Sequence, residues 1–130
     1  MSITWRADRA LLDPTFGNDI DTVLTADPAT WIVICTGRDA AVEAAGHEKW
    51  LADHSQPKYT DPTNSAHCCV PARAADVALV VNGKTIWSYD DPNWIRLYAA
   101  ILAHPRLHSG KSFGDGDHVE QLHWKALRDA

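Results

Sequence analysis

The chain has 130 residues, of which 45% are hydrophobic and 22% are charged. This length suits one domain with a single core, and we expect residues 1–130 to form it. No stretch approaches the roughly 18 unbroken apolar residues of a membrane helix, so we expect no membrane insertion. Twelve Lys and Arg residues face 17 Asp and Glu residues, for a net charge of -5, and the basic residues are scattered singly. This pattern argues against a nucleic-acid partner.

The first half of the chain predicts two helices around one buried strand. Asp13-Pro14 opens a segment with apolar residues at helical spacing (Phe16, Ile20, Val23 and Leu24), and Asp27-Pro28 closes it. Residues 31–36 are apolar and rich in β-branched residues, which is typical of a buried strand. Asp39 can cap a second helix that runs to about His54. Residues 55–64 are polar and contain two prolines, so they predict a loop.

The second half predicts a hairpin, a helix and a final strand. Residues 76–81 and 84–89 flank Asn82-Gly83, the pair that favours a type I′ turn. Asp90 or Asp91 caps the next helix, and His104-Pro105 ends it; its apolar face consists of Trp94, Leu97, Tyr98, Ile101 and Leu102. A glycine-rich loop at 110–116 leads to a strand over 118–122. The order predicts an α+β fold with three helices and a small, mainly antiparallel sheet.

Three polar residues stand where this fold could bring them together at one edge of the sheet. His67 follows the polar loop, Asp76 begins a predicted strand nine residues later, and His118 opens the last strand. Two imidazoles and one carboxylate suit Zn²⁺, and three protein ligands leave a fourth tetrahedral position open, as in catalytic zinc sites. Seven histidines and 17 acidic residues offer many such triples, so ordinary surface or core histidines remain an alternative.

Asp115 lies three residues before His118 in the glycine-rich loop. From there it could place a carboxylate beside a metal centre without binding the ion, which is the position of a general base. A solvated turn is the alternative. A calcium loop is disfavoured, because the spaced oxygen ligands and the final Glu of an EF-hand are missing.

Three ordered segments resemble a known family. They are Ser65-Ala66-His67 followed by residues 73–78 with Ala74-Ala75-Asp76, the closing stretch 112–120, and the upstream stretch 35–39 with Arg38. These segments are similar to motifs of the zinc D,D-carboxypeptidases and L-alanyl-D-glutamate endopeptidases, which include phage endolysins and the vancomycin-resistance dipeptidases. The resemblance covers about residues 31–122 and implies a Hedgehog/D,D-peptidase-like zinc peptidase fold. Here the gap between His67 and Asp76 exceeds the family's usual seven residues, so we expect the intervening loop to bulge.

The resemblance also implies roles. His67, Asp76 and His118 would bind Zn²⁺, Asp115 would be the catalytic base, and Arg38 with Ser65 would hold a carboxylate or the backbone of the substrate. The alternatives for Arg38 and Ser65 are a surface cation at a helix start and a turn hydroxyl.

The function implied is that of a single-domain zinc peptidase acting on bacterial peptidoglycan stem peptides. We expect a monomeric phage endolysin with L-alanyl-D-glutamate endopeptidase activity. A D-alanyl-D-alanine carboxypeptidase or dipeptidase is the second enzyme candidate, and a non-catalytic zinc-binding phage structural module is the third possibility. Residues 1–8 lack the basic start and apolar segment of a secretory signal, so we expect accumulation in the host bacterial cytoplasm before action on the wall.

The cysteines and tryptophans leave two further expectations. Three cysteines, with Cys68 and Cys69 adjacent, cannot form the paired framework of a secreted protein, so we expect free thiols. Either of the adjacent pair could compete for a soft metal. Of six tryptophans, only Trp5 and Trp124 lie outside the predicted core and could stack on a glycan.

Overall fold

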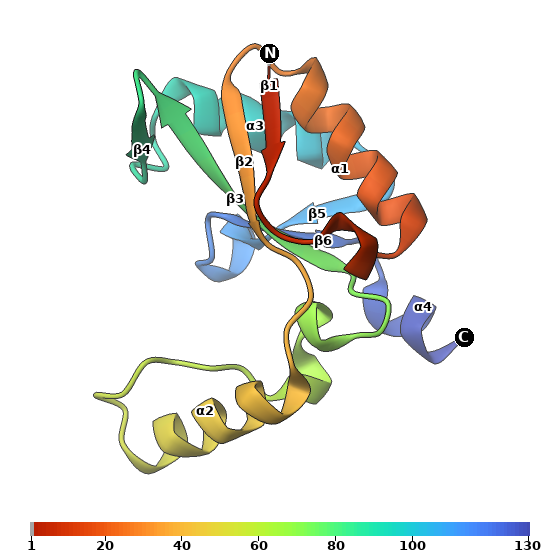
Figure 1. Cartoon of the computed structure of the whole chain (residues 1–130), viewed down its shortest axis with the longest axis vertical. Coiled ribbons are helices and arrows are strands. Elements are labelled where there is room, and N and C mark those ends of the chain that lie inside the picture. Colours follow the sequence, from red (N-terminus) through yellow and green to blue (C-terminus); the bar gives the residue numbers. More distant parts are fainter. Residues whose placement is uncertain (1) are drawn as a thin grey trace.

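The protein has a mixed sheet with its two long core helices on one face, and a helical arm that projects away from the sheet (Figure 1). The computed structural model describes residues 2–130. The helices are α1 (Pro14–Ala26), α2 (Ala40–Ala52), α3 (Pro92–Ala103) and α4 (Trp124–Asp129), with short 3-10 helices η1 (Arg9–Leu11), η2 (Pro62–Asn64), η3 (Ala66–Cys68) and η4 (Gly110–Phe113). The strands are β1 (Ser2–Trp5), β2 (Thr30–Cys35), β3 (Ala74–Val81), β4 (Lys84–Ile86), β5 (Leu107–Ser109) and β6 (His118–Gln121).

The sheet has the strand order β1-β2-β3-β6-β5, with β4 also paired to β3. The β1–β2 pair is parallel and is joined by α1, while the other pairs are antiparallel. Parallel neighbours need such a crossover, and the helix in it then packs on the sheet. The expected, mainly antiparallel sheet is therefore a mixed one.

Both long core helices pack on the same face of the sheet. Alternate residues of β3, namely Ala75, Val77 and Leu79, join the core cluster, as do Trp31 and Val33 of β2. Helices α1 and α3 supply Phe16, Ile20 and Leu24, and Trp94, Leu97 and Ile101, to the same cluster. Because side chains alternate along a strand, Asp76 of β3 and His118 of β6 point to the opposite face. That face carries the polar cluster described below.

Side-chain caps set the helix starts as the sequence predicts. Asp13, Asp39 and Asp91 accept hydrogen bonds from the first-turn amides of α1, α2 and α3, and Pro14 and Pro92 occupy first-turn positions. The hairpin turn at Asn82-Gly83 has the positive φ angles expected of it, 53° and 76°.

Helix α2 departs from the ordinary pattern of a core helix. It extends away from the sheet, together with the returning segment 53–61 (Figure 1). Glu43 is its one buried residue, whereas Val42 and Leu51 are 64% and 56% exposed. We call α2 and residues 53–61 the arm.

Several expectations are corrected by the structure. The described residues form four α-helices rather than three, because residues 124–129 form α4 after the last strand. The hairpin strands are 74–81 and 84–86 rather than 76–81 and 84–89. Leu102, expected on the buried face of its helix, is 88% exposed because the core contact of α3 ends with Ile101. None of the helices within residues 2–130 has the length and apolar character needed to cross a bilayer.

Candidate metal centre and cleft

Two paired strands place Asp76 and His118 side by side. Asp76 of β3 is directly opposite His118 of β6 in the antiparallel register. Both side chains are buried, and His118 Nδ1 lies 3.5 Å from Asp76 Oδ1. The pair is therefore fixed by sheet register and not by a flexible loop.

His67 joins this pair from the short helix η3, which follows the polar loop. Its Nδ1 donates a hydrogen bond to the carbonyl oxygen of Thr36 at 2.6 Å, because a carbonyl can only accept. Its Nε2 lies 3.3 Å from Asp76 Oδ1 and 3.2 Å from His118 Nδ1. The expected bulge is present here as η3 and the turn that follows it.

The three facing atoms fit a tetrahedral cation. His67 Nε2, Asp76 Oδ1 and His118 Nδ1 form a triangle with edges of 3.2, 3.3 and 3.5 Å. Zinc bonds of about 2.0–2.1 Å in a regular tetrahedron separate neighbouring ligands by about 3.3–3.4 Å. The donor set and its spacing therefore suit a zinc ion with one open position. We call these residues the triad.

Two neighbours orient the triad. Glu120 Oε1 lies 2.8 Å from His118 Nε2 and can accept a hydrogen bond from Nε2–H, which leaves the unprotonated Nδ1 to face the other two residues. Arg38 donates to Asp76 Oδ2 at 2.9 Å and so holds the oxygen that does not face the histidines. Both carboxylate oxygens of Asp76 are thereby committed.

Without a cation, the cluster is an ion-pair network. Burial disfavours the charged form of His67, but hydrogen bonds with Asp76 and Cys35 outweigh it and raise the pKa of His67 to about 10. Burial also disfavours the charged form of His118, but hydrogen bonds with Asp76 and Glu120 outweigh it and raise the pKa of His118. Burial alone would raise the pKa of Asp76, but hydrogen bonds with both imidazoles hold it well below its usual range. A divalent cation would take the place of these protons.

Asp115 lies on the solvent-exposed side of the triad. Its Oδ2 lies 3.8 Å from His118 Nδ1, and its side chain is 52% exposed. A carboxylate at this distance can reach a water molecule beside the triad. It could equally serve as an oxygen ligand together with Asp76 and His118, whose donor atoms lie within 4.8 Å of it and of one another. Its neighbour Asp117 is partly buried, and burial together with Asp115 and Asp76 raises the pKa of Asp117 to about 7.

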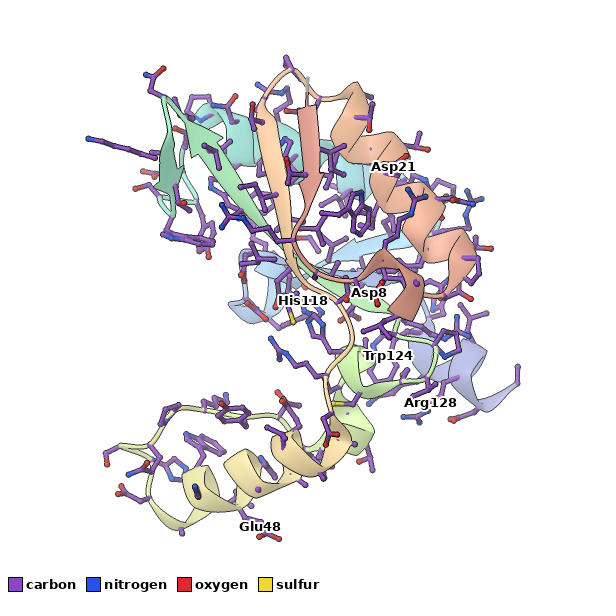
Figure 2. The ribbon with its side chains drawn as sticks, in the orientation of Figure 1. Asp8, Asp21, Glu48, His118, Trp124 and Arg128 are labelled. Carbon is purple, nitrogen blue, oxygen red and sulfur yellow. The ribbon has the colours of Figure 1, made fainter. Side chains whose placement is uncertain are left out.

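The triad opens into a cleft formed by two joined cavities. The inner cavity, of about 330 Å³, is lined by the imidazoles and by the other residues expected at the site, Arg38, Ser65 and Asp115. The outer cavity, of about 660 Å³, lies between the arm and the loop after η4. Arg38, Thr60, Phe113 and Asp115 line both cavities. Figure 2 shows His118 at the end of the sheet that faces the arm, which carries Glu48.

The candidate cysteines and tryptophans differ in whether they reach the triad or the cleft. All three cysteines are free, as expected, but Cys35 and not Cys68 or Cys69 approaches the triad, with Sγ 3.9 Å from His67 Nδ1. Trp124 is buried, with 7% of its surface exposed, yet it lines the inner cavity. Trp5 packs against the core beneath Arg9 and does not line the cleft.

Glu120 and Thr36 are functional neighbours that the sequence analysis left without a role. Glu120 could be found from sequence, because it lies two residues from His118 on a strand and therefore on the same face. The Thr36 carbonyl could not, because a backbone contact leaves no residue-type signal.

Comparison with known proteins is informative at the level of structure. No family model matches the chain, and no curated protein matches it in sequence. Among solved structures, it is similar to the Serratia marcescens L-Ala D-Glu endopeptidase ChiX, with a TM-score of 0.60 and 18% identity, over 87% of this chain and 82% of that one. The chain thus shares the fold of that endopeptidase.

Proposed function

We propose that this protein is a zinc-dependent peptidase that cleaves an amide bond in peptidoglycan stem peptides, with L-alanyl-D-glutamate endopeptidase activity. The observation that carries the proposal is the triad, whose three facing atoms are spaced as tetrahedral zinc ligands are. The fold shared with an L-Ala D-Glu endopeptidase supports the substrate class. The proposal includes the biological role of a phage endolysin, an enzyme that a phage produces to degrade the cell wall of its host.

In this proposal His67, Asp76 and His118 hold the ion. When bound, zinc supplies Lewis acidity that polarises the scissile carbonyl and lowers the pKa of water at the open position. Asp115 accepts the proton of the attacking water and passes it to the leaving amine. Glu120 keeps the His118 ring in the tautomer that the site requires.

Arg38 and Ser65 are assigned to substrate positioning, because both line the inner cavity. Arg38 also secures Asp76, so its free N–H groups and the Ser65 hydroxyl are the parts available to a peptide carbonyl or carboxylate.

The shape of the cleft favours an endopeptidase over a carboxypeptidase. A carboxypeptidase needs a pocket that closes around a chain terminus. Here the outer cavity adjoins the inner one at Arg38 and Asp115, which line both, so there is room for substrate on that side.

The test is Asp115→Asn in the zinc-loaded protein. We expect zinc content and thermal stability to be retained, and hydrolysis of purified sacculi to fall by about 10²- to 10⁴-fold, the range of general acid–base catalysis. Mass analysis of the released fragments, with and without a chelator, identifies the bond. Asp90→Asn, an exposed change outside the cleft, serves as the control.

Two results would contradict the proposal. If the zinc-loaded wild type releases no fragments from sacculi, the protein is a zinc-binding module and not an enzyme. If the Asp115→Asn variant cleaves as fast as the wild type, Asp115 is not the base.

A further inference from the structure

The outer cavity contains a cation without a partner. Lys58 lines it from the arm, and within residues 2–130 its ammonium group has neither a hydrogen bond nor an ion pair. Lys58 Nζ lies over the face of the Trp50 ring, 5.1 Å from the ring centroid. A cation held against an aromatic ring keeps its donors available to a ligand.

The other cations of the cleft are already engaged. Arg38 donates to Asp76 at 2.9 Å and lies 3.8 Å from Glu43, so two carboxylates neutralise it. Lys125, in the inner cavity, donates to the amide oxygen of Asn64 at 2.8 Å. Lys58 is therefore the cleft cation that has neither a hydrogen bond nor an ion pair within the described part of the chain.

The backbone that carries Lys58 is fixed in place. A Cβ on Gly46 of α2 would lie 2.5 Å from the Tyr59 ring, so that ring rests directly on the helix. His47 Nδ1 donates to the carbonyl oxygen of Tyr59 at 2.7 Å, and the Thr60 amide donates to Glu43 Oε1 at 3.3 Å. Residues 58–60 are thus tied to α2, and a preorganised cation loses less entropy on binding.

We propose that Lys58 is a specificity residue that binds a free carboxylate of the substrate peptide in the outer cavity. The inference rests on the proposed function, since it places the substrate across the triad with an acidic residue toward the arm. Stem peptides with free carboxylates would then be preferred over stems whose carboxylates are amidated.

The experiment uses two synthetic stem peptides that contain L-Ala–D-Glu and differ only in whether their carboxylates are free or converted to carboxamides. For the zinc-loaded protein, Lys58→Gln should lower kcat/KM for the acidic peptide by about three- to tenfold, through KM and with kcat unchanged. The amidated peptide should be unaffected. The loss should shrink at high salt, because a partly exposed charge pair is screened.

Lys49→Gln is the matched control. Lys49 is exposed on helix α2 of the same arm and lines neither cavity, and its substitution removes the same charge. If Lys49→Gln has the same effect, or if Lys58→Gln affects both peptides equally or neither, the inference is overturned.

Binding to the zinc-loaded Asp115→Asn variant separates the two proposals. Calorimetry there should show three- to tenfold weaker binding of the acidic peptide when Lys58→Gln is added. If the wild type cleaves neither peptide but this selectivity is seen, the proposed activity fails and the binding site stands. If the acidic and amidated peptides bind equally, the inference fails whatever the activity.

Discussion

Glu120 offers the sharpest test of the metal centre. Its carboxylate lies 2.8 Å from His118 Nε2 and fixes the tautomer whose Nδ1 faces His67 and Asp76. In Glu120→Ala, the ring loses this partner and the buried Nε2–H is left without an acceptor. Removal of such a supporting group typically costs 10- to 100-fold in metal affinity, or about 1.4–2.7 kcal/mol. Glu120→Gln keeps an acceptor oxygen but removes the charge, so we expect a smaller loss.

The assay is zinc competition against a chromophoric chelator, with circular dichroism to show that each variant is folded. Glu48→Ala is the control, because Glu48 is exposed on the arm, far from His118 (Figure 2). If the zinc affinity of Glu120→Ala is within twofold of the wild-type affinity, then Glu120 does not orient His118 for metal binding and the prediction is wrong. An equal loss in Glu48→Ala would point to a general charge effect instead.

Three other predictions follow from burial, packing and titration. Because the pKa of His67 is raised to about 10, protons compete with zinc at neutral pH, and zinc affinity should rise about tenfold per pH unit for each proton displaced. Protonated His67 also stabilises the metal-free fold, fully below about pH 6.5 and progressively less toward pH 10, so the Tm of the metal-free protein should fall over this range. A zinc affinity that does not change with pH would contradict the predicted proton competition. Trp94→Ala, at a fully buried position, should lower the free energy of unfolding in urea by about 3–5 kcal/mol, whereas Leu102→Ala, 88% exposed, should change it by under about 0.5 kcal/mol. Gly110→Ala would press a methyl group against the carbonyl oxygen of Asp115 and to 2.7 Å from His118 Cβ, so sacculus hydrolysis should fall by at least about tenfold; Gly17→Ala, whose nearest neighbours lie at 3.7 Å, should not reduce it.

The elements predicted from sequence are those with a local signal. Helices α1 and α3 have long apolar stripes and aspartate caps, and the hairpin has its Asn82-Gly83 turn. The triad could be anticipated because Asp76 and His118 both begin predicted strands. Their direct opposition depends on strand register, which no local sequence pattern supplies.

The missed elements lack such signals. Strand β1 has four residues and is stabilised by parallel pairing with β2, on the far side of α1 in the sequence. Strand β5 has three residues, which is too short for any alternation to be read. Helix α4 begins at Trp124, its one buried residue; His123, which precedes it, has φ 62° and makes no side-chain cap hydrogen bond. Each is formed by tertiary contacts and not by its own sequence pattern.

The arm makes sense only in relation to the open face of the sheet. The crossover through α1 and the packing of α3 place both core helices on one face, so the triad on the other face stays accessible. Had α2 packed over that second face, it would have covered Asp76 and His118. Leaving Val42 and Leu51 of α2 in solvent forgoes about 1.5–3 kcal/mol for each side chain that could have been buried. Helix α2 gives up this stabilisation and is tied instead through Glu43 to Arg38 and Thr60, so it borders the cleft and contributes little to the core.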